Sequence, residues 1–92
     1  MNEYETFNFN IWRDHIIKTK DISPLKFGMP QEAVIEILGQ PDDISTMKIS
    51  GKPLILKYHD IELHFDERYG NNLFLIYSDY EMELSIAQNK SN

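Results

Sequence analysis

The densest run of side chains that could do chemistry spans residues 59–66, which read HDIELHFD. In a strand, Glu62 and His64 would share one face, as would Asp60 and Asp66, because side chains alternate across the sheet. Imidazole and carboxylate groups so placed could bind a divalent metal if a neighbouring strand supplied further ligands. The sequence identifies no such ligand. We therefore predict that this run forms a solvated face of a sheet and holds no metal.

No other grouping of residues predicts catalysis. The serines show no Gly-x-Ser-x-Gly elbow, so a nucleophilic serine is not indicated. His15 lies beside the apolar stripe of a predicted helix, which favours a boundary position over a catalytic one. Gly28 and Gly39 frame a helix and do not form a loop that cradles phosphate. We predict no catalytic residue, no cofactor and no enzymatic activity.

Acidic residues are concentrated toward the C-terminal end. The net charge is −6, and residues 58–92 carry two Lys/Arg against seven Asp/Glu, whereas residues 1–57 carry seven against eight. Nucleic acid would require the opposite charge. Aromatic side chains ringed by carboxylates suit a protein interface with a basic partner. The predicted partner-binding residues are Glu62, His64, Tyr77, Asp79, Tyr80, Glu81 and Glu83. The alternative is an edge strand that its acids keep from aggregating.

The composition predicts one small domain over residues 1–92, with residues 1–7 and 88–92 frayed. Hydrophobic residues make up 41% of the 92, enough for a packed core. There is no cysteine, which excludes disulfides and cysteine zinc sites. The N-terminal residues do not resemble a signal peptide, and no apolar run approaches the ~20 residues needed to span a bilayer. We expect a cytoplasmic protein that does not bind membranes.

Two amphipathic helices are predicted in the first half of the chain. Phe9, Trp12 and Ile16 recur at helical spacing, which predicts a helix over residues 9–19 with Asn8 as its N-cap. A second, short helix is predicted over residues 30–38. Pro30 suits the first helical position, and Gly39 can adopt the left-handed conformation that ends a helix.

After Pro41 the apolar residues recur with a period of two, which predicts strands. The expected strands cover residues 44–49, 54–58, 61–65 and 73–78, with His59-Asp60 as a two-residue hairpin turn. From Phe74 to Ile86 the even positions continue the alternation, which predicts one long final strand bent near Asp79. A short helix from Tyr80 is the competing interpretation.

These elements predict an α+β fold. Two N-terminal helices would pack on one face of a three- to four-stranded antiparallel meander sheet, because consecutive strands joined by short turns pair with their neighbours.

The segment Gly28-Met29 to Leu38-Gly39-Gln40-Pro41, with Val34 between, resembles the SmpA/OmlA-like group. That group includes the small lipoprotein of the bacterial outer-membrane β-barrel assembly machine, and it implies two helices on a three-stranded antiparallel sheet. Residues 56–65 and 73–79 are also similar to small cytoplasmic bacterial proteins. Some proteins of this architecture look like immunity proteins from toxin–immunity loci. The lipoproteins carry a signal peptide and a lipidated cysteine, whereas this chain shows neither.

Three functions follow as hypotheses. The first is a non-enzymatic immunity-type protein that neutralises a basic toxin domain by occlusion. The second is a housekeeping structural or regulatory module that binds another protein. The third is a metal protein or enzyme that uses His59, Glu62 and His64. A homodimer through an exposed strand edge would compete for the same surface.

Overall fold

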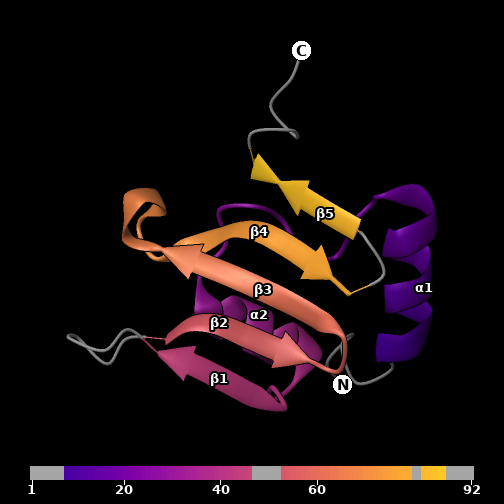
Figure 1. The fold of residues 1–92 in the computed structure, drawn as a ribbon, viewed down its shortest axis with the longest axis horizontal. Coiled ribbons are helices and arrows are strands. Elements are labelled where there is room, and N and C mark those ends of the chain that lie inside the picture. The colour runs from indigo at the N-terminus through magenta and orange to yellow at the C-terminus, as the bar shows by residue number, and fades with distance from the viewer. Residues whose placement is uncertain (1–7, 47–52, 80–81, 87–92) are drawn as a thin grey trace.

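The computed structural model describes residues 8–46, 53–79 and 82–86. Two helices come first and five strands follow (Figure 1). In chain order the elements are α1 (Phe9–Thr19), α2 (Gln31–Leu38), β1 (Asp43–Thr46), β2 (Pro53–Tyr58), β3 (Ile61–Asp66), the 3-10 turn η2 (Glu67–Tyr69), β4 (Asn72–Ser78) and β5 (Met82–Ser85).

The sheet is an antiparallel meander in the order β1-β2-β3-β4-β5. Both helices lie on the same side of it. Helix α2 runs behind the middle strands, and α1 lies near the β2–β3 turn (Figure 1). The predicted α+β fold with two N-terminal helices is therefore confirmed, but the sheet has five strands where three to four were expected.

The fifth strand corrects the prediction for the end of the chain. Residues 82–85 neither prolong β4 nor form a helix, because Ser78 pairs with Met82 and the chain folds back antiparallel. The even-numbered residues on either side of this reversal still lie on one face of the sheet. Ile76, Ser78 and Met82 are fully buried and Leu84 packs against the core, so all four face the helices. Tyr80 lies outside the described residues.

Helix α1 has the bounds predicted from its apolar spacing. The Asn8 side chain accepts a hydrogen bond from the Ile11 amide at 3.1 Å, which satisfies one of the amides that a helix start leaves unpaired. Trp12 and Ile16 are buried. The Trp12 indole also donates to the Ile22 carbonyl at 3.1 Å and so ties the helix to the following connection.

Helix α2 begins one residue later than predicted, at Gln31, because Pro30 is the extended N-cap and forms a bridge with Asn72. Val34 and Ile37 are its buried residues. Gly39 ends the helix with a positive φ of 87° but an extended ψ, so it is not in the left-handed helical conformation expected. Its amide still donates to the Ile35 carbonyl at 2.7 Å.

Two further boundaries follow the sequence closely. The His59-Asp60 turn is confirmed, since Tyr58 pairs with Ile61 and His59 takes a positive φ of 57°. Strand β1 begins at Asp43, one residue before the predicted start, and the predicted residues 47–49 lie outside the described ranges.

The core lies between the helices and the inner face of the sheet. Its buried residues are Trp12, Ile16, Ile22, Leu25, Val34, Ile37, Leu56, Tyr58, Ile61, Leu63, Phe65, Leu73, Ile76 and Met82. Strands β2, β3 and β5 contribute through alternate positions, as a sheet covered on one side requires, whereas β4 departs from the alternation between Leu73 and Ile76. The positions between them define the opposite face, and neither α1 nor α2 lies over it (Figure 1).

Candidate functional site

The uncovered face of the sheet is the candidate site. Strand register places side chains on it in two rows that cross all five strands. The first row is Asp43, Lys57, Glu62, Tyr77 and Glu83. The second row is Ser45, Ile55, His64, Leu75 and Ser85. Side chains opposite one another on antiparallel strands have Cβ atoms about 4.5–5.5 Å apart, so each row is continuous.

Four of the seven predicted partner-binding residues meet on this face. Glu62, Tyr77 and Glu83 are consecutive in the first row, and His64 lies in the second. The His64 Nε2 atom is 3.1 Å from Glu62 Oε1.

The other three predicted residues do not join these rows. Asp79 lies on the connection after β4, where its amide donates to the Asp60 carbonyl at 3.4 Å. Tyr80 and Glu81 lie outside the described residues.

An aromatic cluster on the same face was missed by the sequence interpretation. The Tyr69 and Phe74 rings stack with centroids 4.9 Å apart, and Phe74 meets the His64 ring edge-on at 6.4 Å. The Arg68 guanidinium lies over the Tyr69 ring at 5.8 Å. With the hydrogen bond from Arg68 to Asp66 at 2.9 Å, these contacts link η2 to β3 and β4.

The missed aromatic is Phe74, whose even number placed it with the buried Ile76 in the predicted alternation. A β-bulge reverses this. The register pairs His64 with Leu75 but Phe65 with Leu73, and a shift of one residue moves a side chain to the other face. The run from Leu73 to Ile76 is apolar throughout. Its sequence therefore carries no alternation that could have revealed the bulge.

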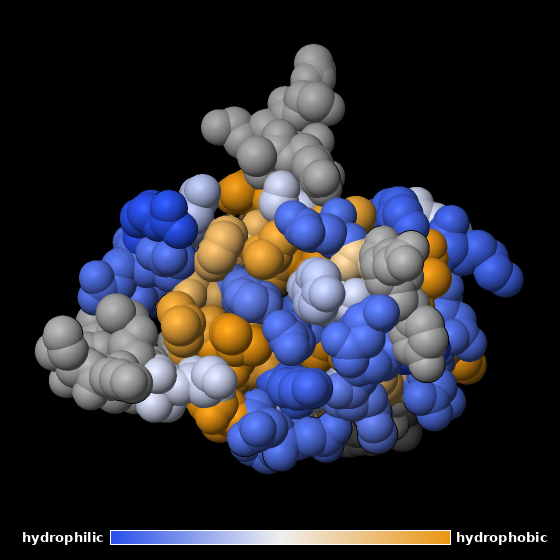
Figure 2. All heavy atoms as spheres, in the orientation of Figure 1, coloured by the Kyte–Doolittle hydropathy of each residue, from blue (hydrophilic) through white to orange (hydrophobic). Residues whose placement is uncertain are grey.

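Figure 2 shows how polarity divides this face. Hydrophobic atoms gather over the ends of β2, β3 and β4 that lie toward η2, and hydrophilic atoms cover the part toward the β2–β3 turn. Ile55, Phe74 and Leu75 are each half-buried there. The face thus combines an apolar part with a charged row.

The three residues of the third hypothesis, His59, Glu62 and His64, do not lie together on one surface. His59 lies on the hairpin turn, where its Nδ1 is 3.8 Å from Asp42 Oδ2, whereas Glu62 and His64 lie on the sheet face. Residues 8–46, 53–79 and 82–86 contain no group of three or more His, Asp or Glu placed to hold a metal. In the same part of the chain, no helix has the length and apolar character to cross a membrane.

A second charged cluster lies at the helix-covered end of the same strands. The Arg13 guanidinium donates two hydrogen bonds to the Asp60 carboxylate, each 2.7 Å long, from Nε to Oδ1 and from Nη2 to Oδ2. Ser78 Oγ lies 3.5 Å from Asp60 Oδ2. The hydrogen bonds from Arg13 hold the pKa of Asp60 below its usual value, although burial opposes them. This cluster fastens α1 to the β2–β3 turn.

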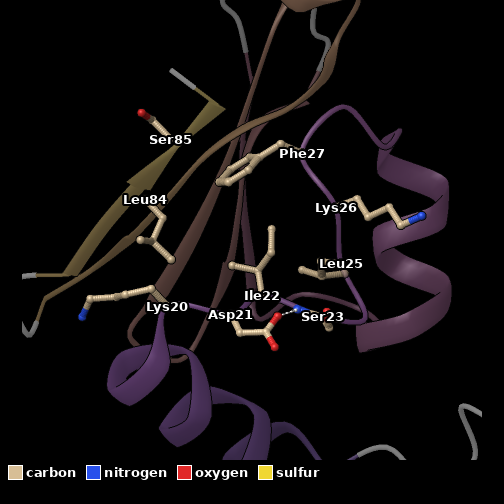
Figure 3. Close-up of a pocket in the computed structure, with 9 residues that line it drawn as sticks. All are labelled: Lys20, Asp21, Ile22, Ser23, Leu25, Lys26, Phe27, Leu84 and Ser85. Carbon is tan, nitrogen blue, oxygen red and sulfur yellow. Dashed lines mark hydrogen bonds between the residues drawn. The ribbon is translucent and has the colours of Figure 1, made fainter. Parts of the chain in front are cut away.

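A hollow of about 560 Å³ lies between the α1–α2 connection and β5. Figure 3 shows Ile22, Phe27 and Leu84 pointing into it, while the amino groups of Lys20 and Lys26 point away. Lys20 Nζ instead donates to the Ile17 carbonyl at 2.8 Å. The lysines at the rim are therefore not aimed at a ligand in the hollow.

These features define an α+β domain with helices on one side of an antiparallel sheet and an uncovered face on the other. Residues 4–58 match the family described as a Domain of Unknown Function with solved-structure structure (DUF3862). The match covers more than half of the 92 residues, so the chain belongs to this family. It ends at Tyr58, before the strands that carry Glu62, Tyr77 and Glu83. No curated protein and no solved structure matches the chain.

Proposed function

We propose that this chain is a non-enzymatic protein-binding domain that contacts a basic partner through the uncovered face of its sheet. The observation that carries the proposal is the row in which Tyr77 stands between Glu62 and Glu83, beside the apolar part of the same face. An apolar and aromatic centre with a charged surround is the usual anatomy of a protein interface.

The charge of the face favours a basic partner. The first row carries three acidic side chains, Asp43, Glu62 and Glu83, against the one basic side chain of Lys57. The whole chain has a net charge of −6. A field of this sign accelerates the encounter with a positively charged surface and disfavours acidic competitors.

In its most specific form, the proposal is an immunity-type protein that occludes a basic toxin domain. Small size, acidity and the resemblance of the Gly28–Pro41 segment to the SmpA/OmlA-like group support this form. If the basic toxin domain were a nuclease, carboxylates of the face would occupy the place of nucleic-acid phosphates. A housekeeping module that binds another protein would use the same face, so the identity of the partner separates the two.

The test is capture of the product of the neighbouring gene by the purified chain. We expect a complex that weakens at least about tenfold in the double variant Glu62→Lys/Glu83→Lys, because two attractive charges become repulsive. The matched control is Glu32→Lys/Glu36→Lys, which makes the same charge change on the exposed side of α2. Absence of a complex, or equal loss in both double variants, would overturn the proposal. A captured partner that is not a toxin would favour the housekeeping module.

A further inference from the structure

We infer that Tyr77 and its two flanking carboxylates form a seat for an arginine side chain of the partner. This inference rests on the proposed function and specifies the chemistry of the partner. Tyr77 is 37% exposed, the highest exposure of any large apolar or aromatic residue in β2 to β5. Glu62 is directly opposite it on β3, and Glu83 is directly opposite it on β5.

The arrangement suits a guanidinium better than an ammonium. A guanidinium is planar, stacks on an aromatic ring and donates pairs of hydrogen bonds to carboxylates, whereas an ammonium is a compact, strongly hydrated charge. Over the Tyr77 ring, a guanidinium would meet a carboxylate on each side. His64 contacts Glu62 through Oε1, which orients that carboxylate along the face.

The second row lies two residues away along each strand and offers an apolar contact. Leu75 precedes Tyr77 by two positions and pairs with His64, whose ring is in contact with Phe74. The stack of Tyr69 on Phe74 fixes this part of the face before any partner arrives. Pre-organised side chains lose less conformational entropy on binding, so they are effective anchors.

The spacing of the rows defines the motif that would bind. Two residues along a strand cover about 6.6–6.8 Å, and an extended segment also presents alternate side chains on one side. An extended segment laid across the face could therefore place arginine on Tyr77 and an aliphatic side chain on Leu75. The complementary motif places arginine and leucine two residues apart, as in Arg-x-Leu.

Charge disfavours a second copy of this chain as the occupant. Two identical faces would bring Glu62 and Glu83 of both copies into one interface, and each copy carries a net charge of −6. Like charges brought together in an interface repel one another, whereas a basic segment complements them.

The experiment is an NMR titration of the ¹⁵N-labelled full chain with synthetic twelve-residue peptides. The first peptide contains one Arg-x-Leu motif in a Gly/Ser background, and a second replaces the arginine with citrulline, its uncharged near-isostere. A third replaces it with lysine, and a fourth replaces the leucine with serine. We expect amide shifts at Glu62, His64, Leu75, Tyr77 and Glu83. The citrulline peptide should bind about fivefold more weakly, as expected for loss of about 1 kcal/mol. The lysine and serine peptides should fall between the two.

Variants of the chain make the test specific. Tyr77→Leu and Glu83→Gln should each reduce the preference for arginine over citrulline at least about twofold. Glu36→Gln, on the exposed side of α2, should leave it unchanged. Amide spectra and thermal melts of each variant verify that the fold is retained.

Three results would overturn the arginine seat: equal binding of the arginine and citrulline peptides, shifts centred on α1 or α2, or shifts of the same residues on concentrating the chain alone. If capture of the neighbouring gene product still depends on Glu62 and Glu83 in that case, the proposed function stands without the seat. If capture is also insensitive to both residues, the proposed function fails with it.

Discussion

Asp60 and Glu62 are two residues apart on the chain, but their carboxylates lie in different surroundings and have different partners. Asp60 receives two hydrogen bonds of 2.7 Å from Arg13 and joins a helix to the β2–β3 turn. Glu62 lies on the uncovered face, with His64 Nε2 at 3.1 Å on its own strand. The Arg13–Asp60 pair connects segments 47 positions apart in the sequence, whereas the Glu62–His64 pair is local.

The two pairs differ in which residues surround them and would be disturbed if the pair were broken. Ser78, which lies beside Asp60, is completely buried, so a disturbance there reaches the core. The exposed fractions of the two pairs are similar, at 23% and 19% for Arg13 and Asp60 and 22% and 26% for His64 and Glu62, so the contrast lies in the neighbours of each pair and in its separation along the chain. We expect the Arg13–Asp60 pair to contribute to folding and the uncovered face to contribute to binding.

Loss of the Asp60 carboxylate is the strongest test of this contrast. Asp60→Ala removes the carboxylate that accepts two hydrogen bonds from Arg13, while Asp14 Oδ1 still accepts one at 3.0 Å, and it should reduce the free energy of unfolding by about 2 kcal/mol. For a domain of this size the melting temperature should fall by roughly 10 °C. Urea denaturation of the wild type, both single variants and Arg13→Ala/Asp60→Ala measures the coupling energy. A coupling energy near zero would contradict a stabilising role for the pair.

The Tyr58 hydroxyl should contribute about half as much. It donates to the Gly39 carbonyl at 2.6 Å and so fastens β2 to the end of α2. Tyr58→Phe should cost about 1 kcal/mol, because water can reach the exposed Gly39 and replace part of the bond.

The Tyr58 hydroxyl should also make the stability of the fold depend on pH in the alkaline range. Burial, together with the nearby Asp42 charge, raises the pKa of Tyr58 to about 12. A group whose folded pKa exceeds its unfolded value near 10 stabilises the fold below pH 10, and that stability is lost as the pH rises toward 12. Tyr58→Phe should lose less stability than the wild type over this range in urea denaturation. Parallel curves would show that Tyr58 is as easily ionised in the folded protein as in the unfolded chain.

Most helices and strands could be predicted from the sequence, because residues within each segment determine its secondary structure. The apolar spacing of Phe9, Trp12 and Ile16 and the Asn8 cap determine α1 within one stretch of chain. The turn at His59-Asp60 separates two strands of clear alternation. The fifth strand was not readable, since alternation continues across Asp79 whether the chain runs straight or reverses.

The candidate site was predicted only in part, for a similar reason. Glu62 and His64 alternate with buried neighbours, so the face they share followed from the sequence, whereas the register that places Tyr77 and Glu83 beside Glu62 did not. The position of Phe74 on the uncovered face depends on a β-bulge. This bulge arises from the pairing of β3 with β4 and is not visible in the sequence of either strand. The stacking of Phe74 on Tyr69 depends in turn on how η2 closes over the end of the sheet.

Acid should weaken the Arg13–Asp60 pair by less than deletion of the carboxylate does. Hydrogen bonds from Arg13 lower the pKa of Asp60 below the ordinary 3.8. Its stabilising contribution is therefore fully present above that value and is lost as the pH falls through the lower, folded pKa. The free energy of unfolding of the wild type should drop more steeply below about pH 4 than that of Asp60→Asn, which has no charge to lose. Identical acid dependence of the two proteins would show that the carboxylate is not held in its ionised form by Arg13.

Substitution of Glu62 should have the smallest effect on stability, in contrast to substitution of Asp60. Glu62→Gln keeps the shape of the side chain and can still bond His64, so the free energy of unfolding should change by less than about 0.5 kcal/mol. The same variant removes one negative charge from the row and should weaken capture of a basic partner. Urea denaturation and capture, measured on one preparation, give both quantities. A loss of more than about 1 kcal/mol of stability with capture unchanged would place Glu62 with Asp60 among the residues that hold the fold, and the uncovered face would then lose its strongest claim to a binding role.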